Sequence, residues 1–190
     1  MVAQVADKIE AGHLQLVCVD SVDAESWYNR DVPPRWRIER HMQYENYIMN
    51  EVVPLARGGQ PDELLIGVGC SFGGYHAADF ALRHPDVFRG FLSMSGAFDT
   101  TNFLRGYYDQ DVYFHQPTQF VANMSDPWYL ERYRRSTYVL ATGEHDQCWN
   151  ANEVMAKVFR DKGIDCKLDV WGDQTGHDWP WWEKMIRTYL

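Results

Sequence analysis

Short apolar segments alternate along the chain with longer segments in which apolar residues recur at helical spacing. The apolar runs, rich in Val, Ile and Leu, predict strands at residues 14–20, 64–69, 90–94, 137–141 and 167–171. The helical spacing predicts helices over residues 5–10, 35–55, 72–83, 150–162 and 180–190. Strands that are apolar nearly throughout are typical of a parallel sheet that helices cover on both faces. The pattern therefore predicts an α/β fold with a mostly parallel sheet.

Residues 97–135 interrupt this alternation, because they are rich in aromatic side chains and show no clean period. Insertions of this kind between a strand and a helix often form lids or pocket walls. A surface excursion whose aromatic side chains anchor it to the core fits the pattern equally well. The length of 190 residues suits one domain over residues 1–190, with the aromatic-rich segment as an insertion.

Charge and composition exclude several classes of protein. The net charge of −9 argues against a nucleic-acid or anionic-membrane partner, since both require a concentrated basic surface. The sequence contains neither a transmembrane run nor a visible secretory signal. Its four cysteines form no CxxC pair and no metal-ligand spacing, so we expect free thiols in a reducing compartment and a cytoplasmic protein.

A candidate nucleophile lies between the predicted strand 64–69 and the predicted helix 72–83. Residues 69–74 read G-C-S-F-G-G and match the pattern G-x-S-x-G around Ser71. In a strand–turn–helix context such a serine occupies a strained turn, and we expect Gly69 and Gly73 to be required because a Cβ at either position would clash. The first amides of the helix would then lie beneath the reacting oxygen, so the Phe72 N–H is the predicted oxyanion donor. The pattern alone arises by chance in many proteins. The predicted strand before it, the predicted helix after it and the later candidate acid and base make a chance match much less probable here.

His177 is the candidate base among seven histidines. A neutral serine is a poor nucleophile, so the fold must bring a base to it. His177 lies in the loop 172–178, directly after the last predicted strand and before the last predicted helix. The tryptophans at positions 179, 181 and 182 either hold its imidazole in place or simply cover the core.

Asp146 is the candidate acid, which would fix the tautomer of the imidazole and stabilise its protonated form. It follows the predicted strand 137–141 and therefore lies at the same sheet edge as Ser71. Glu144 and Asp173 are the alternatives. The chain order serine, aspartate, histidine differs from the orders in which chymotrypsin-like and subtilisin-like proteases carry the same three residues.

At these residues the sequence resembles the putative-esterase branch of the α/β-hydrolases, which includes S-formylglutathione hydrolases, feruloyl esterases and mycolyltransferases. The resemblance rests on residues 69–74, on H-P-D-V-F at 84–88, on L-S-M-S-G at 92–96, on 143–146, and on G-H-D-W-P-W-W at 176–182. It implies a three-layer α/β-hydrolase fold and hydrolysis of small or aryl carboxylic esters through an acyl-enzyme. It implies no metal and no organic cofactor.

The chain departs from this family at its beginning, where strands that precede residues 14–20 are missing, so we expect an N-terminally shortened fold. The loop that normally supplies the second oxyanion N–H is missing with them. We expect residues 14–20 to pair with 64–69 in a right-handed βαβ unit and the loop 21–24 to supply that donor. Alternatively the nucleophile strand exposes an edge through which a homo-oligomer forms.

Two other functions compete with the esterase. An acyltransferase would use the same acyl-enzyme but pass the acyl group to an acceptor other than water. Whether hydrolysis or transfer occurs depends on how well the site excludes water. A non-catalytic, hydrolase-like protein is the third possibility. For the small-molecule ester substrate, Trp149 and Trp179 are the predicted binding residues, with Trp27, Tyr28 and the aromatic insertion as further candidates for the pocket wall.

Overall fold

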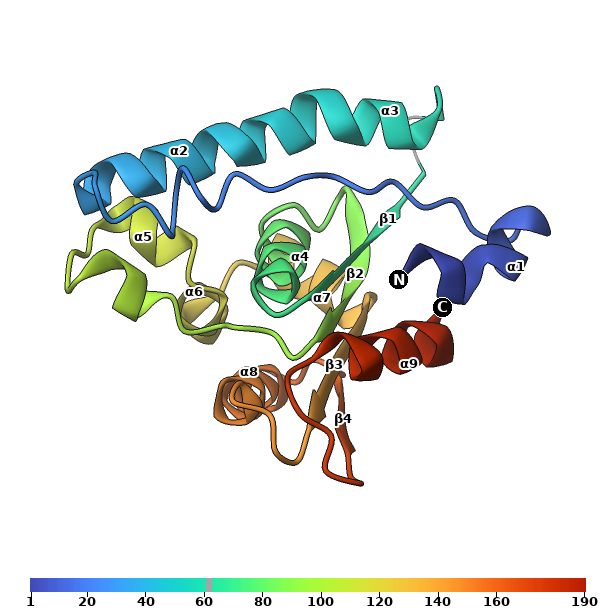
Figure 1. Ribbon diagram of the computed structural model, residues 1–190. Helices are drawn as coiled ribbons and strands as arrows, with labels where there is room; N and C mark the ends of the chain where they lie inside the picture. The colour runs from blue at the N-terminus through green and yellow to red at the C-terminus, as the bar shows by residue number, and fades with distance from the viewer. Residues whose placement is uncertain (61–62) are drawn as a thin grey trace.

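A four-stranded parallel sheet forms the centre of the molecule in the computed structural model, which describes residues 1–60 and 63–190. The strands are β1 (Leu65–Cys70), β2 (Phe88–Met94), β3 (Thr137–Gly143) and β4 (Lys167–Trp171), and they lie side by side in that order (Figure 1). All neighbouring pairs are parallel. Four of the five predicted strands are therefore confirmed, with shifts of at most two residues at their ends.

The helices that connect and cover the sheet also match the predicted ones closely. In chain order they are η1 (Val2–Val5), α1 (Ala6–Glu10), α2 (Pro34–Tyr47), η2 (Ile48–Val52), α3 (Val53–Arg57), α4 (Phe72–Arg83), α8 (Trp149–Asp161) and α9 (Trp179–Tyr189). Among the described residues, every helix falls short of the length and apolar character that crossing a membrane requires.

Successive residues of β2 and β3 point to opposite faces of the sheet and bury two separate apolar clusters. Phe91 and Tyr138 belong to the cluster on the face covered by α4 and α8, together with Phe159 of α8. Leu92 and Ala141 belong to the cluster that includes residues of η1 and α9 on the other face. Both faces are therefore covered, which makes the fold three-layered and accounts for the nearly continuous apolar character of these strands.

The long predicted helix at 35–55 extends to Arg57 but is not a uniform α-helix. Residues Ile48–Val52 form a π-helical turn between α2 and α3. Pro54 lacks an N–H and its ring would clash with the carbonyl four residues earlier in a regular α-helix, and the wider turn directly before it relieves this conflict. The helix ends at Gly58, which adopts the left-handed conformation at φ 56°.

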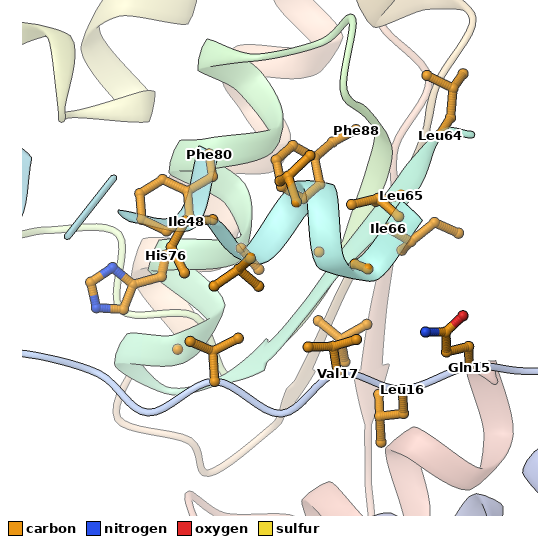
Figure 2. A pocket seen from close by; sticks show the side chains of 18 of the residues that line it. Gln15, Leu16, Val17, Ile48, Leu64, Leu65, Ile66, His76, Phe80 and Phe88 are labelled. Carbon is orange, nitrogen blue, oxygen red and sulfur yellow. The ribbon is translucent and has the colours of Figure 1, made fainter. Parts of the chain in front are cut away.

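The prediction of a strand at residues 14–20 is wrong. This segment runs extended past β1 but is not part of the sheet, so β1 is an edge strand with β2 as its neighbour. A cavity of about 490 Å³ separates the two, lined by Leu16 and Val17 on one side and Leu65 and Ile66 on the other (Figure 2). Neighbouring strands must lie about 4.8 Å apart to form hydrogen bonds. The predicted βαβ pairing with β1 is therefore absent, and self-association through this edge stays a prediction.

The aromatic-rich segment at 97–135 folds into four short helices. These are η3 (Thr101–Leu104), α5 (Gln110–Phe114), α6 (Pro117–Asn123) and α7 (Pro127–Arg134). Phe98, Phe120 and Tyr133 are buried in the main core, and the Tyr133 hydroxyl donates a hydrogen bond to the Leu82 carbonyl at 2.6 Å. Most of the insertion is thus anchored to the core, as one of the two sequence interpretations expects.

Candidate active site

Ser71 occupies a strained turn between β1 and α4. Its backbone has φ 54° and ψ −121°, a conformation that residues with a side chain rarely adopt. The turn is held in place by the Ser71 N–H, which donates to the Met94 carbonyl at 2.8 Å. Backbone strain of this kind persists only where the surrounding structure enforces it, and it is concentrated at functional sites.

Two glycines make this turn possible: Gly69, as the motif predicts, and Gly74 in place of the predicted Gly73. A Cβ at Gly69 would lie 2.1 Å from the Gly73 carbonyl oxygen, so residue 69 must be glycine. A Cβ at Gly73 would meet nothing within 4 Å, so the expectation that this position requires glycine is wrong. A Cβ at Gly74 would lie 2.4 Å from the Ser93 hydroxyl oxygen and 3.1 Å from the Gly96 Cα. The close approach of α4 to the sheet therefore depends on Gly69 and Gly74.

His177 lies in the loop between β4 and α9 and faces Ser71. Its Nε2 is 2.8 Å from the Ser71 Oγ. Its Nδ1 is 2.9 Å from Oδ1 of Asp146. The buried Trp182 packs its ring edge-on against the imidazole, with centroids 4.9 Å apart, and its Nε1 donates to the Ser95 hydroxyl at 2.9 Å. The tryptophan after the loop thus supports the imidazole and covers the core at the same time.

Asp146 is the carboxylate that the structure brings to His177. It follows β3 in a tight turn in which its N–H donates to the Gly143 carbonyl. Its buried Oδ1 also accepts the Cys148 N–H at 2.7 Å. The alternatives are directed elsewhere: the Glu144 side chain accepts the N–H of Gln174 and is largely exposed. Asp173 lies exposed in a left-handed turn at φ 56°.

The pKa values of the two partners shift in opposite directions. The hydrogen bond to Asp146, together with the neighbouring Cys148, raises the pKa of His177 above its usual 6.5. Burial is the largest single influence on the pKa of Asp146 and raises it, but the hydrogen bonds that the carboxylate accepts, the one from His177 foremost, together outweigh burial and lower the pKa overall. Each group therefore stabilises the charged form of the other, as an imidazole and a carboxylate in contact must.

The Phe72 N–H is available at the start of α4. As the first helical residue, it has no carbonyl within the helix to which it could donate. The loop 21–24 is held beside the same helix, because Asp23 accepts hydrogen bonds from His76 at 2.8 Å and from the Ser21 hydroxyl at 2.9 Å. The predicted donor of the second oxyanion hydrogen bond thus lies on a segment that is tied to α4.

Aromatic side chains from separate segments meet beside the turn that carries Ser71. The Phe72 ring contacts the rings of Tyr28 and Phe103, with centroids 5.1 and 5.2 Å apart. Tyr28 is 48% exposed, so this cluster presents an aromatic surface to solvent. The sequence marks the aromatic insertion as a candidate pocket wall, but the insertion shows no period that would single out Phe103 within it.

The two predicted substrate-binding tryptophans begin the two helices that follow the acid and the base. Trp149 is the first residue of α8, and its N–H donates to the Asp146 carbonyl at 3.0 Å. Trp179 is the first residue of α9, is 55% exposed, and packs edge-on against Trp182. Their role in substrate binding stays a prediction.

Cys148 is a neighbour of this site that sequence reasoning missed. One ligand atom each from Asp146, Cys148 and His177 lie within 4.8 Å of one another. The available signal was the spacing of two residues between Asp146 and Cys148, which places both in the same turn after β3. The four cysteines are free thiols, as expected, but Cys18 is exposed and the other three are only partly buried, whereas the sequence suggests mostly buried thiols.

Two further histidines, His41 and His115, lie in a buried polar network away from Ser71. Asp79 of α4 accepts hydrogen bonds from His41 at 3.2 Å and from His115 at 3.0 Å. Burial, the largest influence on His41, lowers its pKa to about 4 and keeps it neutral. The network connects α2, α4 and the insertion, so His41 has a structural role.

The fold and the site together define a member of the α/β-hydrolase class. Within that class the chain belongs to the Putative esterase family, whose model matches residues 2–189. No curated protein is similar enough in sequence to match the chain.

Several solved structures share the fold. A ferulic acid esterase superposes with a TM-score of 0.62 at 22% identity, covering 76% of this chain and 58% of that one. An S-formylglutathione hydrolase from Agrobacterium tumefaciens has a TM-score of 0.60 at 13% identity, with coverage of 76% and 54%. Its counterpart from Staphylococcus aureus has a TM-score of 0.57 at 18% identity, with coverage of 82% and 62%. The chain thus spans little more than half the length of these proteins.

Proposed function

We propose that this protein is a serine hydrolase that cleaves small or aryl carboxylic esters through an acyl-enzyme. The observation that carries the proposal is the continuous hydrogen-bonded series from Ser71 through His177 to Asp146, with distances of 2.8 and 2.9 Å. Membership of an esterase family and the likeness to a ferulic acid esterase support it.

In the proposed mechanism Ser71 attacks the ester carbonyl while His177 accepts the hydroxyl proton at Nε2. Asp146 holds the imidazole so that Nδ1 carries its proton, and stabilises the imidazolium that forms. His177 then protonates the leaving alcohol, which departs and leaves the acyl group on Ser71. A water molecule then attacks the acyl-enzyme while His177 accepts its proton. His177 returns this proton to the Ser71 oxygen as the carboxylic acid is released.

Negative charge on the carbonyl oxygen is stabilised by the Phe72 N–H and the positive end of α4. We propose the loop 21–24 as the source of a second N–H, since Asp23 ties it to α4 through His76. Removing one donor typically costs about 10²- to 10³-fold in turnover. The rate of the enzyme therefore depends on how well this loop is positioned.

The ester substrate is proposed to lie over the aromatic surface formed by Tyr28 and Phe103, with Trp149 and Trp179 as further contacts. The buried Phe72 ring packs against both of these rings and its N–H is the proposed oxyanion donor, so an aryl group packed there is close to the reacting carbonyl. The free cysteines support a cytoplasmic location, since disulfides are rare in a reducing compartment.

Labelling of Ser71 with a fluorophosphonate probe, with the modified residue assigned by mass spectrometry, tests this function directly. We expect one labelled serine, Ser71, and hydrolysis of p-nitrophenyl acetate that Ser71→Ala abolishes. Unchanged hydrolysis in Ser71→Ala would overturn the proposal. A folded protein whose Ser71 does not react with the probe would favour a non-catalytic role.

A further inference from the structure

Cys148 lies beside the His177–Asp146 pair without a role in the proposed reaction. It is the residue before α8, and its N–H donates to the Asp146 Oδ1 that also accepts the His177 Nδ1–H. This shared acceptor holds the three residues together. Their side chains each offer one ligand atom, and these atoms lie within 4.8 Å of one another.

The three side chains form a chemically coherent ligand set. A thiolate, an imidazole and a carboxylate are the groups that bind zinc, which takes four ligands in a tetrahedral arrangement and leaves one position open where the protein supplies three. The second carboxylate oxygen of Asp146 is buried and makes no hydrogen bond within the described residues. A cation beside it would offset the cost of burying an unpartnered acceptor.

The buried cluster of His41, Asp79 and His115 provides a contrast. Its three ligand atoms are equally close, but both histidines donate to the same Asp79 oxygen at ordinary hydrogen-bond distances, which accounts for the arrangement. All three side chains of that cluster are buried. His177 and Cys148 are only partly buried, so an ion can reach them from solvent.

We propose that Asp146, Cys148 and His177 form a reversible inhibitory site for a zinc ion. Binding replaces the thiol proton, which passes to solvent, and uses a nitrogen lone pair of the imidazole. Coordination at Nδ1 leaves Nε2 protonated and unable to accept the Ser71 proton, and coordination at Nε2 takes the position that the Ser71 hydroxyl occupies. Either geometry prevents Ser71 from being activated. The binding step is independent of the proposed esterase function, whereas the inhibition rests on it.

The test measures zinc binding and Ser71 reactivity separately. Chelator-treated protein is titrated with zinc sulfate, bound metal is measured by equilibrium dialysis with elemental analysis, and Ser71 is labelled with a fluorophosphonate probe at each concentration. We expect one zinc ion per chain, loss of labelling in parallel with binding, and recovery on adding EDTA. Cobalt(II) in place of zinc should give a thiolate-to-metal absorption band in the near ultraviolet.

Cys148→Ser is the decisive variant, because it keeps the size of the side chain and removes the thiolate. Labelling of each protein is expressed relative to its own rate without metal, because Cys148 also raises the pKa of His177. We expect half-inhibition of the variant to require at least about tenfold more zinc, since losing even an outer partner of a metal ligand costs 10- to 100-fold. Cys18→Ser, which removes an exposed thiol, is the matched control and should behave as the wild type.

Equal zinc sensitivity of Cys148→Ser and the wild type would overturn the proposal, as would zinc bound without protection of a reactive Ser71. If Ser71 fails to react with the probe even without metal, the esterase function fails. The dialysis and cobalt spectra still decide in that case whether Cys148 binds metal.

Discussion

His177 and Ser71 are 106 positions apart in the chain, yet the imidazole Nε2 lies 2.8 Å from the serine Oγ. Three parallel strands bring about this contact. Ser71 follows β1, Asp146 follows β3 and His177 follows β4, so all three side chains emerge at the carboxyl edge of one sheet. Ligands of open α/β sheets bind at this edge.

Asp146→Asn should lower kcat for p-nitrophenyl acetate by about 10⁴-fold, because the amide favours the wrong tautomer of His177. Asp173→Asn and Glu144→Gln are the matched controls, since neither carboxylate contacts His177 in the structure. Both controls should retain most of the wild-type activity in a steady-state assay. A large loss in Asp173→Asn with a mild effect of Asp146→Asn would reassign the acid.

Hydrolysis should increase with pH, since only the neutral imidazole of His177 can accept the Ser71 proton. The hydrogen bond to Asp146 raises the pKa of His177, so the half-maximal value of kcat/KM should lie above pH 6.5. In Asp146→Asn the carboxylate charge is lost, and the midpoint should move to lower pH. A pH profile with the same midpoint in both proteins would contradict the assigned pairing.

Gly69→Ala and Gly74→Ala should destabilise the fold by about 3 kcal/mol or more, because each new methyl group would overlap neighbouring atoms. Gly73→Ala should change the free energy of unfolding by less than about 1 kcal/mol, since space is open there and alanine favours the helix. Urea unfolding of the three variants measures the difference. Equal losses in all three would mean that the motif glycines act through flexibility rather than through space.

Acid should weaken the contacts of Glu45, which accepts hydrogen bonds from Arg83 and His84, each at 2.7 Å. Burial raises the pKa of Glu45, but the hydrogen bonds from His84 and Arg83 outweigh it and lower the pKa from 4.5 to about 2. A folded-state pKa below the unfolded one means that Glu45 stabilises the fold above pH 4.5. This contribution is lost as the pH falls toward 2.

Glu45→Gln should therefore lower the free energy of unfolding by about 3 kcal/mol at pH 7, as expected when one partner of a buried ion pair is removed. The difference from the wild type should shrink as the pH approaches 2. Denaturant unfolding at several pH values tests this. Glu131→Gln, in an exposed pair with Arg135, should have little effect, and a pH-independent loss in Glu45→Gln would show that charge is not the cause.

Periodicity predicted β1 to β4 and the long helices well, because doubly covered strands and amphipathic helices carry their burial pattern in the sequence itself. The segment at 14–20 has the same apolar character, and there the prediction failed. Pairing requires a neighbour at hydrogen-bonding distance, and the segment lies beyond a cavity from β1 (Figure 2). An extended, apolar stretch is compatible with a strand, but it does not determine whether another strand lies close enough to pair with it.

The sequence by itself determined the candidate nucleophile, base and acid, because each lies in the turn or loop after a recognisable strand and parallel strands place their ends at one edge. Only the tertiary structure decided that Gly74 rather than Gly73 is required beside Ser71, that Phe103 joins Phe72, and that Cys148 lies against His177. These relationships depend on the direction of single side chains across gaps of a few ångströms. Direction of this kind is set by packing between elements and leaves no period in the sequence.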